Sequence, residues 1–255
     1  MNSLSWFLQG QLYRGKNFKG FSASVLKLFA IIAMVIDHFG ASYIEEGIFS
    51  ISETLTSRQL DWWIALDGWL RVFGRITFPV MAFFIVEGMF KTRDVKKYAI
   101  RLGIFALVSE IPFDLATENM LFDMQHQNIF FTLLIGLVAI AIADRIPMQY
   151  ALVRLVPILA AMVLAYVLKT DYGAVGIVVI ALMYGFYRVR LSKEVIGGVF
   201  IATELTLPKV GIASLIYVAM MFFYNGERGF NMKYFFYLFY PVHLLILGII
   251  LRTQF

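Results

Sequence analysis

Asp37 and His38 are adjacent in the stretch AMVIDHFGAS, residues 33–42, which is otherwise apolar. A histidine side chain has an ordinary pKa of about 6.5, which suits it to accept and return a proton near neutral pH. A carboxylate beside the ring would fix its tautomer and stabilise its charged form. Because Asp37 points roughly 100° away from His38 around a helix, Glu110, from another apolar segment, is an equal candidate for that partner. We predict Asp37, His38 and Glu110 as the catalytic set, with a purely structural hydrogen bond as the alternative.

Further polar side chains are expected at the same level as His38. A helix rises about 1.5 Å per residue, so His38 and Glu110 each lie roughly 20 Å from the start of their apolar segments. An ionisable group at the centre of a membrane helix costs on the order of 3 kcal/mol, and a gathering of such groups at one level therefore indicates a functional site. The predicted lining, with candidates for stabilising an oxyanion or binding an anionic group, is Arg71, Arg75, Asp114, Asn128, Thr132 and His243.

The composition indicates a membrane protein. Hydrophobic residues make up 60% of the chain and charged residues 15%, with a mean hydropathy of +0.77. Soluble domains are about 45–50% apolar and about 25% charged, so most of the excess apolar surface must face lipid. The chain has no cysteine, which excludes disulfides, thiolate catalysis and cysteine-based metal sites. Well-separated histidines and the lack of an HExxH motif predict no metal centre.

The elements that position these groups are apolar segments long enough to be membrane helices, for which about 17–25 residues are needed. They predict an all-α transmembrane bundle of about nine spans, with a range of about eight to ten. The seventh and eighth segments are short and separated by Pro208 and Gly211, so a broken or re-entrant element is the alternative there. The predicted spans are 25–45, 70–90, 97–115, 128–144, 151–168, 172–188, 194–208, 210–225 and 234–252.

The charges predict an orientation. Most basic residues fall before the first segment and in alternate connections, whereas acidic residues dominate the others. By the positive-inside rule, the N-terminus is predicted to be cytoplasmic and the C-terminus external, in a multi-pass protein of the bacterial cytoplasmic membrane. The net charge of +5 is therefore topological and implies no nucleic acid. Residues 1–24 are predicted to form a basic interfacial segment in contact with lipid, and 46–68 the longest external segment, with Trp62, Trp63 and Trp69 in an aromatic belt.

One cytoplasmic connection carries a concentrated basic run, KTRDVKKYAIR, residues 91–101. The run is first of all a topology signal. A second role in binding phosphates is also predicted, with Lys91, Arg93, Lys97 and Arg101 as the contacting residues.

Taken together, the motifs resemble those of the TraX family, named for a conjugal-transfer protein that acetylates the N-terminus of F-type pilin. The resemblance runs in order through nearly the whole membrane portion. It is carried by LKLFAIIAMVIDHFG (26–40), LRVFGRITFPVMAFFIVEG (70–88), YAIRLGIFALVSEIPFDL (98–115), NIFFTLLIGL (128–137), DYGAVG (171–176) and YPVHLL (240–245). The chain also looks related to wider membrane acyltransferases that use an intramembrane histidine near the first helix.

The resemblance implies that 25–255 is a single transmembrane acyltransferase-like domain that takes acetyl groups from cytoplasmic acetyl-CoA. Asp37 and His38 would be the catalytic pair. The residues implied to line the site are Arg71, Arg75, Glu110, Asp114, Asn128, Asp171 with the adjacent Tyr172, and His243. The acceptor would be an amine or hydroxyl outside the membrane, on a pilin-like N-terminus or a cell-envelope glycan. Direct transfer and an acetyl-histidine intermediate both stay open, and the oligomeric state is unknown.

Two other classes of function fit the same residues. In a proton-coupled transporter, Asp37, His38, Glu110 and His243 would form a proton relay. In a non-catalytic assembly factor, the polar groups would be structural. Binding of acetyl-CoA separates the enzyme from both alternatives.

Overall fold

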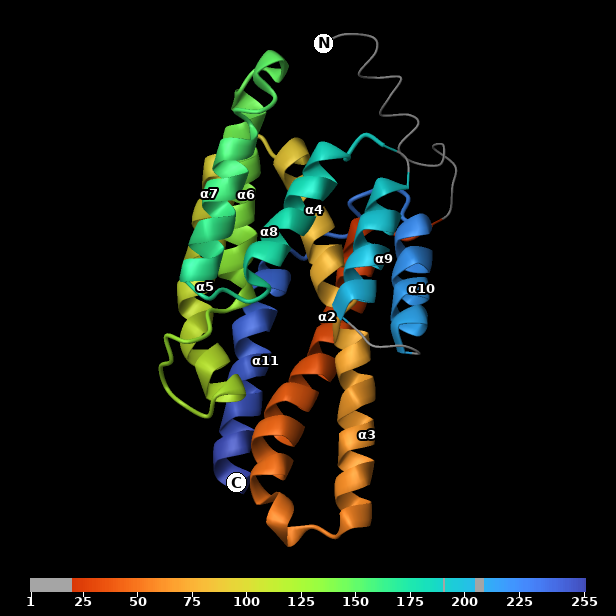
Figure 1. Ribbon diagram of the computed structural model, residues 1–255, viewed down its shortest axis with the longest axis vertical. Coiled ribbons are helices and arrows are strands. Elements are labelled where there is room, and N and C mark those ends of the chain that lie inside the picture. Colours follow the sequence, from red (N-terminus) through yellow and green to blue (C-terminus); the bar gives the residue numbers. More distant parts are fainter. Residues whose placement is uncertain (1–19, 190, 205–208) are drawn as a thin grey trace.

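The computed structural model describes residues 20–189, 191–204 and 209–255, without the side chains of Lys209, Val210 and Lys233. The described chain is all helical and forms one elongated bundle (Figure 1). In order, the elements are α2 (Ala23–Phe39), η1 (Gly40–Ile48), η2 (Phe49–Thr54), α3 (Ser57–Gly74), α4 (Thr77–Lys91), α5 (Val95–Thr117), α6 (Ile129–Arg145), η3 (Met148–Tyr150), α7 (Leu155–Val167), α8 (Gly173–Gly185), α9 (Ser192–Glu204), α10 (Lys209–Phe222) and α11 (Lys233–Gln254). Most of the predicted segment 1–24 and the predicted break at Pro208 lie outside the described residues.

Every predicted apolar segment coincides with at least one helix, so the all-α class is confirmed. The helices differ in length. Helices α7, α8 and α9 have 13 residues each and α10 has 14, whereas a complete crossing takes about 20. The number of complete spans and their orientation stay predictions. Among the described residues, the helical stretches long and apolar enough to cross a membrane are Ala23–Thr54, Ser57–Lys91 and Tyr234–Gln254.

The segment predicted as an external connection is largely helical. Helix α2 continues through a π-helical stretch, η1, and a 3₁₀ stretch, η2, before the chain turns into α3. A capping box begins α3: the Gln59 backbone N–H donates to Thr56 Oγ1 at 3.4 Å, and the Thr56 N–H donates to Gln59 Oε1 at 2.9 Å. The resulting helical hairpin extends well beyond the short helices α7 to α10 (Figure 1), and Trp62 and Trp69 remain exposed on it.

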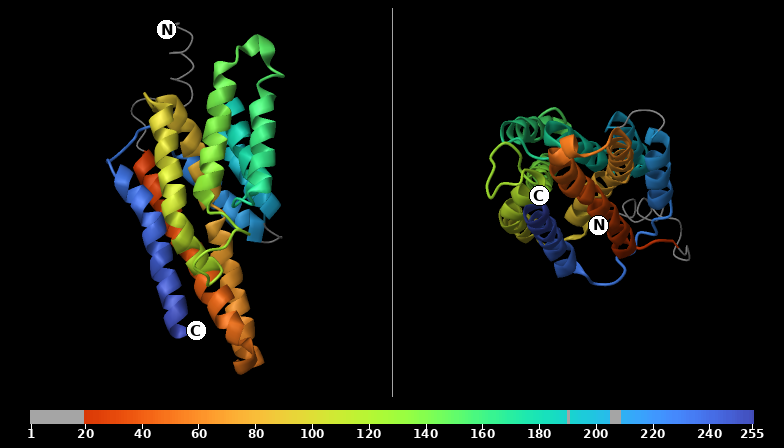
Figure 2. Two further views of the ribbon diagram at one scale, coloured as in Figure 1. Left: turned by 90° about the vertical axis from the view of Figure 1, so that its left-hand side faces the viewer. Right: turned by 90° about the horizontal axis from the view of Figure 1, so that it is seen from below.

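The basic connections gather at one end of the bundle, which we call the basic end. Helix α2 begins there, and the α4–α5, α6–α7, α8–α9 and α10–α11 connections lie at the same end (Figures 1 and 2). The start of α2 is fastened to the α10–α11 connection, because the Phe21 N–H donates to the Phe223 carbonyl and the Ala23 N–H to the Glu227 carbonyl, both at 2.8 Å. The C-terminus and the tip of the α2–α3 hairpin lie at the opposite end.

Polar backbone enters the middle of the bundle at two places. Helix α3 ends at Gly74 and α4 starts at Thr77, and the short helices α7 and α8 are joined by a connection at mid-length (Figure 1). Asp171 in that connection donates its backbone N–H to the Gln127 carbonyl at 2.8 Å. The hydroxyl oxygens of Thr132, on α6, and Thr170 are hydrogen-bonded to each other at 2.9 Å. Non-helical backbone at such depth is tolerated where it is buried in protein or lines a cavity.

Candidate active site

His38 of α2 and His243 of α11 form a hydrogen-bonded pair, with 2.7 Å between His38 Nδ1 and His243 Nε2. His243 Nδ1 lies 2.8 Å from the backbone carbonyl oxygen of Phe239. A carbonyl oxygen only accepts, so His243 Nδ1 carries a hydrogen and, in a neutral ring, its Nε2 accepts the hydrogen on His38 Nδ1. His38 Nε2 is then unprotonated and available to accept a proton.

Aromatic rings hold the histidine pair. The two imidazole planes are nearly parallel, with an angle of 4° between them. Phe239 stacks on His243 with ring centroids 5.1 Å apart, and Tyr240 presents its ring edge-on to both histidines, at 5.8 and 5.7 Å. Packing of this kind restricts rotation of both rings and so keeps the hydrogen bonds that set their tautomers.

Asp37 faces α3. Its Oδ1 accepts a hydrogen bond from Arg71 at 2.9 Å, and the same guanidinium reaches Glu45 at 3.2 Å. Gly74 makes room for this arrangement, since a Cβ at that position would lie 2.1 Å from Asp37 Oδ1. Among the described residues, the hydrogen-bonding partner of the His38 ring is His243, and neither of the two predicted carboxylates bonds to it.

Glu110 is engaged with Asn128. The Asn128 side-chain amide donates to Glu110 Oε2 and, at 2.8 Å, to the Ala106 carbonyl, while its Oδ1 accepts the Phe130 N–H at 3.1 Å and so caps α6. The other carboxylate oxygen, Glu110 Oε1, is buried without a hydrogen-bonding partner in the described part of the chain. These contacts join α5 to the start of α6.

Two more predicted site residues, Asp114 and Thr132, form hydrogen bonds to the connections between helices. Asp114 Oδ2 accepts the Asp123 backbone N–H at 2.7 Å and so holds the α5–α6 connection. Thr132 also donates to the Asp171 carbonyl. Both side chains are fully buried, and their contacts hold the α5–α6 and α7–α8 connections in place.

Arg75 and Tyr172 form a polar pair beside the histidines. Arg75 donates to the Tyr172 hydroxyl at 3.5 Å, and Arg75 Nε is buried with no hydrogen-bonding partner among the described residues. Tyr172 has a positive φ of 59° at the start of α8 and stacks on Phe78, with centroids 4.2 Å apart. This left-handed conformation is uncommon for a bulky residue and often marks a functional position.

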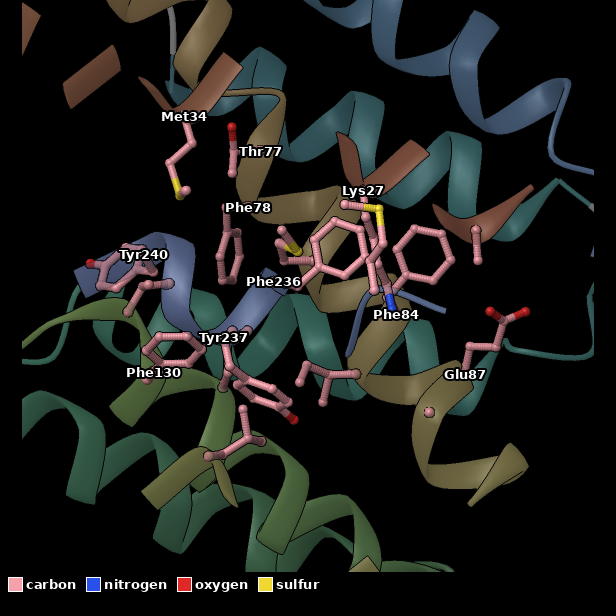
Figure 3. A pocket seen from close by; sticks show the side chains of 18 of the residues that line it. Lys27, Met34, Thr77, Phe78, Phe84, Glu87, Phe130, Phe236, Tyr237 and Tyr240 are labelled. Atoms are coloured by element: carbon pink, nitrogen blue, oxygen red, sulfur yellow. The ribbon is translucent and has the colours of Figure 1, made fainter. Parts of the chain in front are cut away.

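A cavity of about 470 Å³ extends from His38 to the basic end of the bundle. Figure 3 shows Met34, Thr77 and Tyr240 towards one end, and Phe84 and Glu87 towards the other. Of the predicted site residues, those that line the cavity are Asp37, His38, Lys91, Arg101, Asp171 and Tyr172. Those that do not line it are Arg71, Arg75, Arg93, Lys97, Glu110, Asp114, Asn128, Thr132 and His243.

Of the four predicted phosphate-binding residues, Lys91 and Arg101 line the cavity, whereas Arg93 and Lys97 do not. Lys97 points away from the cavity, with its side chain 76% exposed and Asp94 at 3.5 Å. Asp94 caps α5, and the hydrogen bond from the Lys97 backbone N–H lowers the pKa of the Asp94 carboxyl below its usual range. Lys91 does line the cavity and is 3.0 Å from the buried Glu87, which also accepts from the Tyr224 hydroxyl at 2.7 Å.

Sequence reasoning missed several lining residues, chiefly Lys27, Arg228 and Tyr240. The position of Lys27 in the sequence could have indicated that it lines the same site as His38. It precedes His38 by eleven residues, which is close to three helical turns, so both side chains face the same side of α2. Arg228 carried no comparable signal, because it lies in a connection whose path depends on the whole bundle.

Long apolar helices that carry buried ionisable groups define a helical membrane protein. The chain belongs to the TraX family (TraX protein), which it matches over residues 22–251. It is 29% identical over 253 residues to the probable fimbrial assembly protein FimC, serogroup H1, of Dichelobacter nodosus, covering 89% of this chain and 94% of that protein. No solved structure shows significant similarity.

Proposed function

We propose that the protein is a transmembrane acetyltransferase, which transfers an acetyl group from acetyl-CoA to an amine or hydroxyl on the outer side of a bacterial cytoplasmic membrane. The observation that carries this proposal is the cavity that joins the His38 ring to the basic end. The family, named for a pilin acetylase, and the fimbrial name of the relative favour a pilin-like N-terminus as acceptor. A cell-envelope glycan is the second acceptor class.

The cavity suits a long, slim donor that enters from the basic end. Its volume of about 470 Å³ lies within the range of roughly 300–1,000 Å³ that small-molecule sites occupy. Phe84, Phe236 and Met81 line its length with apolar surface, and Lys91 and Arg101 line the basic end. We propose that this end faces the cytoplasm, where acetyl-CoA is made, with the thioester held beside His38.

The proposed reaction is direct transfer. His38 Nε2 removes a proton from the acceptor amine or hydroxyl as the acceptor atom attacks the thioester carbonyl carbon. The new C–N or C–O bond forms, the C–S bond breaks, and the proton on His38 passes to the CoA thiolate. His243 keeps the proton-accepting nitrogen of His38 directed into the cavity through their hydrogen bond.

Tyr172 is the best placed group to donate to the oxyanion that forms during attack. Tyr172 lines the cavity, and its hydroxyl accepts a hydrogen bond from the Arg75 guanidinium, which places a positive charge beside it. Arg75 and Asn128 are the donors that the sequence suggests, but Asn128 already gives its amide hydrogens to Glu110 and the Ala106 carbonyl. Asp37 is proposed to act through Arg71, as a positioning residue for α2 and α3.

The test is acetyl transfer from labelled acetyl-CoA by the purified protein in detergent, with release of CoA and label on the protein both followed. His38→Ala should abolish CoA release. The matched control is His126→Ala, since His126 lies in the exposed α5–α6 connection. Label retained on the wild type and lost in His38→Ala would indicate an acetyl-histidine route.

Two results would contradict the proposed acetyltransferase activity and favour another class of function. If the wild type neither binds nor turns over acetyl-CoA, the donor assignment is wrong. Flux driven by a pH gradient in proteoliposomes would then support the proton-coupled transporter, and absence of flux the non-catalytic assembly factor.

A further inference from the structure

Lys27 is an unusual side chain for the interior of a bundle. It lies one turn into α2, lines the cavity and is half-buried. Its Nζ sits over two aromatic rings, 4.7 Å from the Phe84 centroid and 5.8 Å from the Phe236 centroid. Among the described residues, no hydrogen bond or ion pair satisfies its three N–H groups. Glu87 is the nearby carboxylate that attracts this ammonium, but without a hydrogen-bonded partner among the residues described the charge is incompletely compensated.

The same end of the cavity holds further positive charge. Arg101 Nε is buried with no hydrogen-bonding partner in the described part of the chain, and Lys91 and Arg228 also line this end. The one carboxylate there among the described lining residues, Glu87, is bound by Lys91 and the Tyr224 hydroxyl. The local balance is strongly positive, which calls for a ligand with more than one negative charge.

We propose that this end of the cavity is a diphosphate site inside the bundle, in which Lys27 and Arg101 bind the diphosphate of CoA. The inference rests on the proposed function and deepens it: the phosphates bind within the bundle and not on the basic surface run that contains Arg93 and Lys97.

Length supports this assignment. Lys27 and His38 are eleven residues apart on one helix, about 16 Å at 1.5 Å per residue. In acetyl-CoA, the chain between the thioester sulfur and the nearest phosphorus has about thirteen bonds, and bonds of roughly 1.3–1.5 Å advance an extended chain by about 16 Å. A diphosphate at Lys27 therefore places the thioester at His38.

The first experiment compares two donors, acetyl-CoA and S-acetylpantetheine, which has the same thioester but no phosphate. Lys27→Gln should raise KM for acetyl-CoA about tenfold or more, as expected for the loss of one charge-assisted contact, with kcat within about twofold. It should leave S-acetylpantetheine turnover unchanged, and Lys27→Arg should stay close to wild type. The matched control is Lys97→Gln, whose side chain is exposed outside the cavity. Equal losses with both donors, or no loss with either, would overturn the proposal.

A second measurement does not depend on turnover. Binding of CoA, inorganic pyrophosphate or a prenyl diphosphate should raise the Tm of the wild type and of Lys97→Gln, and raise it much less in Lys27→Gln. If CoA and pyrophosphate stabilise the wild type in this Lys27-dependent way but no transfer occurs, the anion site stands and the enzyme assignment fails. If transfer occurs and Lys27→Gln behaves as wild type, the enzyme assignment stands and the diphosphate site at Lys27 is wrong. A prenyl diphosphate that stabilises more than CoA would assign the site to a lipid and overturn CoA as the ligand.

Discussion

His243 accepts a hydrogen from one imidazole and donates its own to a backbone carbonyl, so a single side chain sets the tautomers of both rings. In serine hydrolases a carboxylate performs the corresponding task and also stabilises the charged imidazole. The partner here is neutral. The basicity of His38 therefore depends on its tautomer and its surroundings, and a neighbouring negative charge contributes less.

At the residue scale, we expect replacement of His243 to lower the rate without removing substrate binding. His243→Phe leaves His38 Nδ1 without its acceptor, so the ring is free to adopt the wrong tautomer, and kcat should fall about 100-fold or more. KM should change by less than about threefold. His243→Gln places a side-chain carbonyl near the same point and should recover part of the loss, as measured by steady-state kinetics.

His126→Phe is the control for this pair of variants, because it removes the remaining histidine of the chain from an exposed connection. Equal rates for His243→Phe and His243→Gln would show that the hydrogen bond is unimportant, and a large loss of Tm in both would assign His243 to packing.

The sequence singled out both histidines but not their contact. His38 and His243 are 205 positions apart, and whether they meet depends on how α2 and α11 are rotated about their axes. The pattern of acidic residues favoured a carboxylate partner instead. Asp37 is turned away by its position on the helix, and Glu110 is held by Asn128.

At the scale of elements, the start of α6 depends on Asn128. Its side chain caps the helix and also satisfies Glu110 and the Ala106 carbonyl. Asn128→Ala removes the cap and leaves the buried Glu110 Oε2 with only the weak backbone N–H of position 128, at 3.4 Å, at a cost of about 2–4 kcal/mol. Thermal unfolding in detergent should show a Tm lower by roughly 5–10 °C.

A double-mutant cycle with Glu110→Ala separates the two losses. The double variant should be less destabilised than the sum of the single variants, since it contains no poorly satisfied carboxylate. Strict additivity would contradict the coupling. Glu110→Gln adds a direct test of the predicted catalytic role: loss of turnover with an unchanged Tm would support it, and loss of Tm with turnover retained by the folded protein would assign Glu110 to structure.

The positions of the helices were largely predictable, because each long apolar run must be helical to satisfy its backbone in lipid. The helix over 57–69 was not, because charged residues such as Arg58, Asp61 and Asp67 lower its hydropathy. Hydropathy detects contact with lipid, and this part of α3 forms an extended hairpin with α2 and η1.

At the scale of the whole molecule, charge and connectivity agree: alternate connections carry the basic residues and lie at one end of the bundle. The orientation of that end is directly testable, because the chain has no cysteine and a single introduced thiol reports its own side. Met124 in the α5–α6 connection and Lys96 near the start of α5 are both exposed.

In spheroplasts, a membrane-impermeant maleimide should label Met124→Cys and leave Lys96→Cys unlabelled until the membrane is permeabilised. This outcome follows if the basic end is cytoplasmic. The reverse pattern would place the basic end outside, away from cytoplasmic acetyl-CoA, and would remove the proposed route of the donor.

The short helices α7, α8 and α9, of 13 residues each, have a consequence for the surrounding lipid. Each is about 20 Å long, against a hydrocarbon thickness of about 30 Å. A bilayer that meets this flank must thin or dimple, at a cost of fractions of a kcal/mol per Å of mismatch. Tyr172, at the start of α8, then lies near a depressed lipid surface. In the proposed reaction, donor and acceptor would therefore meet across a barrier thinner than the membrane, and the acyl-chain length of the lipids would affect the rate.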